Sequence, residues 1–424
     1  MSPSVNDLKQ HVLAGFFATA GVSAGLALTA TLALAHGSDA VAQYLALLGA
    51  AYILFGAPFA AARLVAVSNL ALNPSTISKI AAFAWLIGVI GYLIGITFQK
   101  EQWMVNACLL VISIAISESI HLRAMLLGTS WQNELVQRLL FPTTFILLNI
   151  YIGSSSQLPL LHLISVLTAL LAFELVTLGT TRKLAVSKTI PGAAHSSLGR
   201  DFVNRLTFQL SAQGFSWGVI SLLGFTGSSV EAYLLRIVLQ FRGVGLLLHR
   251  ALKPSAARTI ANCKDAPEYS SQNARRRLIA MTRFALVPAG TLILAGVVLS
   301  AEIGWGSTLL LETANASWTA FTGRSGCGNC SYFVQAILFG GILAAFEAFF
   351  GYSGLALNIL DRGNALRRIS LISISLLLPT GIIVFSGAGL IWIVAALAAY
   401  TIIVNLLLSH SIRHTAVRRI WAIF

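Results

Sequence analysis

The stretch LISISLLLPTGIIVFSGAGLIWIVAALAAYTIIVNLLLSH, residues 371–410, contains no aspartate, glutamate, lysine or arginine. One helix that crosses the hydrocarbon core of a bilayer needs about 20 apolar residues. The stretch therefore predicts most of two consecutive membrane spans, 367–386 and 388–410, which meet near Gly387.

The rest of the chain has the same character. Of its 424 residues, 57% are hydrophobic and only 10% are charged, against roughly 25% charged residues in an ordinary soluble domain. The mean hydropathy is +0.82. Such a chain cannot cover a water-exposed surface, which excludes a soluble enzyme, a nucleic-acid-binding domain and a disordered protein. We predict an all-α polytopic membrane protein.

Hydrophobic segmentation predicts about 12 transmembrane helices with short connections. Besides the two spans above, the predicted spans are residues 11–35, 41–70, 79–98, 103–127, 136–153, 157–180, 203–226, 231–252, 279–300 and 332–358.

The basic residues predict the orientation of these spans. The net charge is +14, and lysine and arginine collect in cytoplasmic loops of membrane proteins. With the N-terminus inside, the outer loops hold only Lys100 and Arg324, whereas inner loops hold clusters such as 275–277. Both termini are therefore expected in the cytoplasm, and the positive charge does not indicate a nucleic-acid partner.

A short repeat suggests two six-helix lobes. The motif ALNPS at 71–75 returns as ALKPS at 251–255, 180 residues later. Two parallel halves of six helices would both start inside. We expect an N-terminal lobe over 1–180, a basic cytoplasmic linker over 181–202 and a C-terminal lobe over 203–424.

Ionisable residues inside the predicted spans are the functional signal, because a charge at bilayer depth costs several kcal/mol unless it meets a partner or water. They are Arg63, Glu118, Arg138, Glu174, Arg205, Arg236, Arg242 and Glu347.

The span 231–252 carries the sharpest pattern. At 100° per residue, Tyr233, Arg236 and Gln240 share one small, polar face, and Arg242 points roughly 120° away from Arg236. Arg63 lies in the span 41–70, on a stripe with small residues. We expect these five side chains to line a cavity that binds an anionic group, because arginine suits bidentate phosphate contacts. The alternative is pairing of the arginines with Glu118, Glu174 or Glu347.

Signatures of catalysis are weak. The sequence has no Walker A and no HExxH motif, and Glu118 with His121 is its one E-x-x-H pair. Cys327 and Cys330 form C-G-N-C in an outer loop, which favours a local disulfide or inert thiols over metal or redox chemistry. We expect no catalytic residue, no metal and no cofactor.

Two segments of the second half resemble a known family. Residues 227–278 and 351–371 are similar to polysaccharide-biosynthesis flippases of the multidrug/oligosaccharidyl-lipid/polysaccharide exporter superfamily. Gly354, Leu357, Asn358, Gly363, Arg368 and Ile369 follow the family's turn between its tenth and eleventh helices, although Gly363 is displaced and Asp361-Arg362 intervene.

The resemblance implies alternating access between two lobes around a cationic cavity, in which Arg236 and Arg63 match family arginines. It implies a multi-pass inner (plasma) membrane protein that flips a polyprenyl-diphosphate-linked oligosaccharide from the cytoplasmic to the outer leaflet. Its partners would be that lipid-linked substrate, the bilayer, and the polymerase and glycosyltransferases of surface polysaccharide (lipopolysaccharide) synthesis.

Two other functions remain open from the residues. A cation-coupled small-molecule exporter of the same fold should show a cavity carboxylate in its first lobe, but spans 11–35 and 41–70 contain no aspartate or glutamate. A membrane glycan polymerase should carry a large outer loop with catalytic groups. The loop 301–331 offers Glu302, Glu312 and Arg324 but no histidine.

Overall fold

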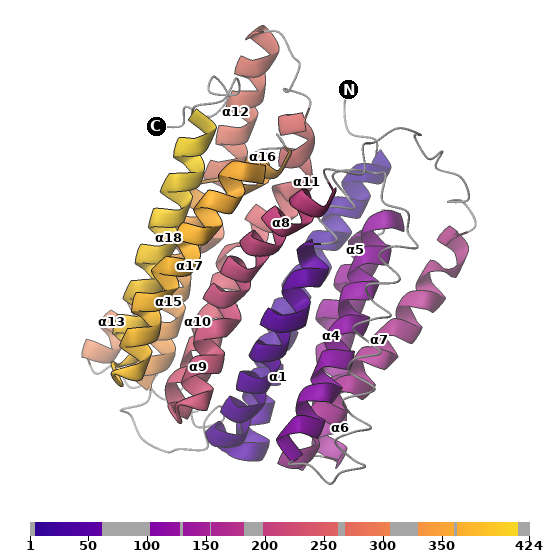
Figure 1. The fold of residues 1–424 in the computed structure, drawn as a ribbon, viewed down its shortest axis with the longest axis vertical. Coiled ribbons are helices and arrows are strands. Elements are labelled where there is room, and N and C mark those ends of the chain that lie inside the picture. Colours follow the sequence, from indigo (N-terminus) through magenta and orange to yellow (C-terminus); the bar gives the residue numbers. More distant parts are fainter. Residues whose placement is uncertain are drawn as a thin grey trace. The chain divides into compact units, whose positions relative to one another are not determined.

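A computed structural model describes residues 5–61, 102–127, 130–152, 154–181, 198–261, 268–305, 330–359 and 363–413. These residues form helices, and the described connections between them are short turns (Figure 1). The all-α prediction is confirmed. Predicted span 79–98, the end of span 41–70 including Arg63, and the C-G-N-C motif up to Asn329 lie outside the described residues.

In the first half the helices are α1 (Val5–Ala51), α4 (Gln102–Leu127), α5 (Ser130–Glu134), α6 (Phe141–Ile152), α7 (Leu158–Thr181), α8 (Leu198–Gln213) and α9 (Val219–Phe225). Three π-helical turns interrupt them, η1 (Tyr52–Gly56), η2 (Leu135–Leu140) and η4 (Gly214–Gly218), and η3 (Ser155–Gln157) is a short 3-10 turn.

In the second half the helices are α10 (Ser229–Gly245), α11 (Leu247–Ala261), α12 (Glu268–Ala285), α13 (Val287–Trp305), α15 (Cys330–Phe349), α16 (Ser353–Ile359), α17 (Gly363–Phe385) and α18 (Leu390–Arg413).

Seven helical stretches within the described residues are long and apolar enough to cross a membrane. They are Asp39–Ala61, Gln102–His121, Trp131–Ile152, Ser155–Thr177, Ala274–Ala301, Ala365–Phe385 and Leu390–Ser411. The chain is therefore a multi-pass membrane protein. Helix also covers most of the described residues of the other predicted spans. The total of twelve and the side on which the termini lie stay predictions.

Glycines explain where helices break. Gly37 has φ 77° and ψ 165° inside α1, so its backbone leaves the helix there. That conformation is essentially restricted to glycine, and it separates predicted spans 11–35 and 41–70. Gly351, at φ 63°, follows the end of α15 at Phe349. The expected single span 332–358 is thus two helices, α15 and α16.

Packing divides the chain into two compact units, Met1–Ala232 and Tyr233–Phe424. The boundary falls later than the linker expected over 181–202, because α9 packs tightly on α1. A side-chain carbon at Gly224 would meet Ala46 Cβ at 2.6 Å and the Ala42 carbonyl oxygen at 2.8 Å. The predicted lobe limits themselves are untested.

Each unit has its own apolar packing. In the first unit, Ile120 and Ala124 of α4 pack with Ala169 and Phe173 of α7. In the second unit, α13 and α15 approach closely at Gly341, where an added Cβ would lie 3.0 Å from Ile293. Helices α17 and α18 run side by side in the same unit (Figure 1).

Candidate substrate site on helix α10

Helix α10 is enclosed by protein on nearly all its faces. Side chains in successive positions are 3% exposed or less, namely Ala232, Tyr233, Leu234, Leu235, Ile237 and Val238. Glu231 in the first turn and Arg242 in the last turn both complement the helix dipole. A helix apolar on several faces belongs in a protein interior, so its polar residues require a specific explanation.

Two of the predicted site residues stay partly accessible in this enclosed helix. Arg236 and Gln240 are half-buried, while Tyr233, on the same face, is 3% exposed. Tyr233, Arg236 and Gln240 follow one another at intervals of one helical turn, so they lie on one face of α10, as predicted. Their role in binding substrate stays a prediction.

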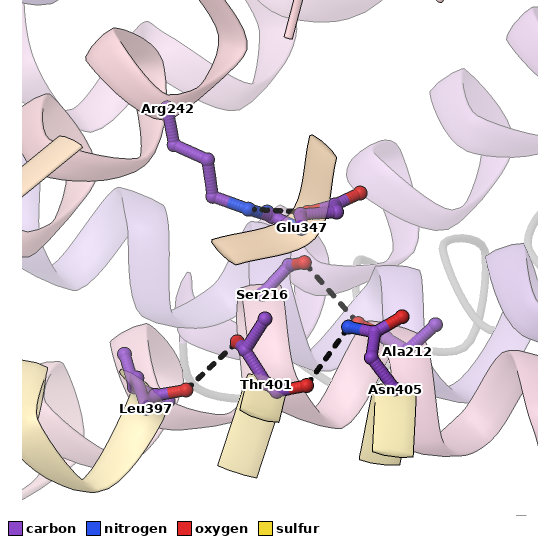
Figure 2. A network of polar contacts seen from close by, with 7 residues as sticks. All are labelled: Ala212, Ser216, Arg242, Glu347, Leu397, Thr401 and Asn405. Carbon is purple, nitrogen blue, oxygen red and sulfur yellow. Dashed lines mark hydrogen bonds and ion pairs between the residues drawn. The ribbon is translucent and has the colours of Figure 1, made fainter. Parts of the chain in front are cut away.

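Arg242 is engaged within the second unit. Its Nε donates to Oε2 of Glu347 on α15 over 2.9 Å, and its Nη2 contacts the same oxygen. Figure 2 shows the guanidinium directed at that carboxylate. The side chains are 17% and 31% exposed. For Arg242, ion pairing, the alternative to substrate binding, is thus the arrangement observed.

Helix α11 is tied to the turn before α16 next to this pair. The rings of His249 and Tyr352 stack with centroids 4.3 Å apart and planes at 9°. The Tyr352 hydroxyl donates to the His249 carbonyl oxygen over 3.2 Å. The sequence analysis did not single out either residue, because it weighed the aspartate, glutamate, lysine and arginine residues of the spans, and neither is one of these.

The other ionisable residues of the predicted spans differ in their partners and their burial. Arg138 pairs with Glu134 one turn earlier, at 2.5 Å, which is a local contact. Arg205 is 5% exposed, and Glu118 and Glu174 are half-buried. Among the described residues no three His, Cys, Asp or Glu side chains converge as they would around a metal ion.

The first unit holds a polar cluster that the sequence analysis did not single out. The Tyr44 hydroxyl is hydrogen-bonded to Nδ1 of His162, and both side chains are buried. Two turns earlier on α1, His36 Nε2 donates to Asn149 Oδ1 of α6 over 2.6 Å. The available signal was a histidine inside an apolar span, which is uncommon.

Comparison with known proteins finds similarity in fold but not in sequence. No family model matches the chain, and no curated protein matches it. Solved structures do. The Lipid II flippase MurJ in an inward closed conformation superposes with a TM-score of 0.58 at 14% identity, over 97% of this chain and 88% of that one.

Two MATE transporters superpose on this chain about as well as the flippase does. The multidrug transporter DinF-BH gives a TM-score of 0.54 at 14% identity, covering 98% of this chain and 96% of that one. A mutant of VcmN from Vibrio cholerae gives 0.57 at 13% identity, covering 96% and 98%. The chain therefore has the fold of transporters of the multidrug/oligosaccharidyl-lipid/polysaccharide superfamily.

Proposed function

We propose that this chain is a transporter that flips a polyprenyl-diphosphate-linked oligosaccharide from the cytoplasmic to the outer leaflet of the plasma membrane. The fold shared with a lipid flippase and the family resemblance around α10 and α16 support this proposal. The lobes would alternate in opening a cationic cavity to either side.

The observation that carries the proposal is Arg236. It is a half-buried cation on a helix whose neighbouring positions are almost all closed to solvent. A diphosphate must leave water to cross a bilayer, and charge-assisted hydrogen bonds from a guanidinium offset part of that desolvation. Tyr233 and Gln240 lie on the same face, where they would contact the first sugar or the diphosphate.

The test is a flipping assay in proteoliposomes with a fluorescent polyprenyl-diphosphate-linked disaccharide, whose outer-leaflet fraction is quenched by an impermeant reductant. Arg236→Ala should abolish flipping while the protein still accumulates. Arg236→Lys should restore part of the rate, because lysine keeps the charge but not the planar fork. Arg283→Ala, at an exposed arginine of α12, is the matched control and should flip normally. Full activity of Arg236→Ala would overturn the site.

A small-molecule exporter is the second candidate, because the MATE transporters superpose about as well as the flippase. The same proteoliposomes loaded with a fluorescent cationic dye distinguish the two. Dye transport without lipid flipping would favour the exporter. A glycan polymerase would instead lengthen the labelled glycan, which mass spectrometry of the recovered lipid would reveal.

A further inference from the structure

His162 of α7 is a titratable side chain enclosed in the first unit. It is 5% exposed, and its partner Tyr44 of α1 is 6% exposed. The rings of Phe141 and Phe145 on α6 flank the imidazole, with centroids 4.9 Å and 5.6 Å away. Among the described residues, the polar partner of His162 is the Tyr44 hydroxyl alone.

A second hydrogen-bonded pair extends this cluster toward the break in α1. His36, next to Gly37, is half-buried and bonds to Asn149 of α6. Asn149 is 2% exposed, and its Nδ2 has no hydrogen-bond partner among the described residues. Water is the natural partner for a buried amide donor of this kind. Asn149 lies one turn from Phe145, whose ring contacts both Tyr44 and His162.

Among the described side chains, no charged group on the surrounding helices contacts the imidazole. Glu174 lies 12 residues further along α7, roughly 18 Å at 1.5 Å per residue. Asp39 of α1 accepts a hydrogen bond from Ser229 over 2.5 Å. Among the side chains that the structure describes, the other ionisable ones on the helices packed against α7 are Cys108, Glu118 and His121 on α4, Glu134 on α5, Arg138 on η2 and Tyr151 on α6.

A proton on His162 would therefore add an uncompensated charge to an enclosed site. Such a charge costs several kcal/mol unless water reaches it. The neutral imidazole tolerates the enclosed arrangement, while the protonated form favours a hydrated one. Proton occupancy and the conformation of the first unit are thus linked, because a ligand shifts the equilibrium toward the state that binds it better.

We propose that His162 is the proton-binding site that couples a transmembrane proton gradient to transport, with Tyr44 as its positioning residue. The proposal rests on the proposed transport function and names its driving ion. A proton-coupled transporter needs a titratable group in its first lobe. Spans 11–35 and 41–70 have no carboxylate for this role, and His162 would take it.

The Tyr44 contact survives the protonation change. With hydrogen on Nδ1, the neutral imidazole takes a further proton from water at Nε2; with hydrogen on Nε2 it takes the proton at Nδ1, and the Tyr44 hydroxyl turns from donor to acceptor. The phenol hydroxyl both donates and accepts, so it bonds to Nδ1 whether or not that nitrogen is protonated. Release returns the same proton to water on the other side.

The experiment records charge movement after a pH jump, using the purified full chain in proteoliposomes on a solid-supported membrane. Wild type should give a transient current. His162→Gln should lose it, because glutamine does not titrate, whereas His410→Gln, at an exposed histidine of α18, should keep it. A normal current in His162→Gln overturns the proposal.

A second variant keeps the test decisive if His162→Gln does not accumulate. Tyr44→Phe retains the imidazole but removes its hydrogen bond, so the pH midpoint of the current should move by about one unit. An unmoved midpoint also overturns the assignment.

The two proposals fail separately. A current that requires His162, without flipping of the labelled lipid by wild type, would refute the flippase and keep the proton site. Flipping by wild type, together with a current that His162→Gln retains, would refute the proton site and keep the flippase.

Discussion

The guanidinium of Arg242 and the carboxylate of Glu347 satisfy one another in the second unit, with both Nε and Nη2 directed at one oxygen. Removing one partner of an enclosed pair leaves an uncompensated charge. Arg242→Met and Glu347→Gln should therefore each lower the free energy of unfolding by about 1–3 kcal/mol, a value reduced for partial exposure.

The double variant Arg242→Met/Glu347→Gln measures the coupling. It should be less destabilised than the sum of the single variants by about 1–2 kcal/mol. Thermal unfolding of the purified protein in detergent provides the measurement. Strictly additive losses would mean that the contact contributes nothing to stability.

Sequence could identify the ionisable residues within the membrane but not their partners. Arg242 had three candidate carboxylates, and the one it contacts is 105 residues away. Periodicity describes one helix at a time, so it cannot select between helices that meet only through tertiary packing. The buried His162 escaped notice for the same reason, since its partner Tyr44 is 118 residues away.

At the scale of elements, glycines set the distance between α10 and α15. A Cβ on Gly340 would lie 2.8 Å from the Val238 carbonyl oxygen and 2.9 Å from the Arg242 nitrogen. Gly340→Ala should push the helices apart and cost about 1–3 kcal/mol in thermal unfolding. Gly290→Ala on α13, where nothing lies within 4 Å, is the control and should be neutral. Equal effects of the two substitutions would argue against the close approach.

The break inside α1 makes a second prediction. Gly37 has open space around it, so the effect of alanine there is conformational rather than steric. Gly37→Ala should lower the free energy of unfolding by about 1–3 kcal/mol, the usual cost of that backbone region for an L side chain. Unchanged thermal unfolding would show that the backbone relaxes without loss.

The positions of the helices were largely predictable, because in a bilayer a run of apolar residues must satisfy its backbone within a helix. Their interruptions were not. The expected span 231–252 divides at Leu246 into α10 and α11. The π-helical turns at 52–56 and 214–218 also have no hydrophobic signature.

For the whole molecule, charge distribution predicts the topology. Reporter fusions at Gly37, Gly153 and Gly326 should report the outer side, and fusions at Pro191, Asp265 and Phe424 the cytoplasm, because basic loops stay inside. Activity of paired reporters, normalised to protein level, measures this. A swapped result in the middle of the chain would mean a miscounted helix and would refute the two-lobe plan.

The fold class was predictable from composition and from a resemblance in the second half, and the structural comparisons extend the likeness over 97% of the chain. The division into units was not predictable. The linker 181–202, suggested by a basic stretch, stays a prediction, and the compact units rest on packing instead: Gly49 and Gly224 lie between α1 and α9, which keeps residues up to Ala232 in the first unit. Loop charge reports orientation, not which helices pack together.

The two partners of the ion pair between α10 and α15 are also synthesised at different times. Synthesis proceeds at about 5–20 residues per second, so Arg242 enters the membrane roughly 5–20 seconds before Glu347, 105 residues later, is made. Over that interval Arg242, in the last turn of α10, lacks the Glu347 carboxylate, and an arginine at bilayer depth disfavours insertion by up to about 3 kcal/mol. Helix α10 should therefore settle in the bilayer only once α15 follows it. Helix α10 has no cysteine of its own, so one must be introduced there. A nascent chain with that cysteine, stalled before residue 330, should react with a water-soluble thiol reagent in α10, and the full-length chain should not.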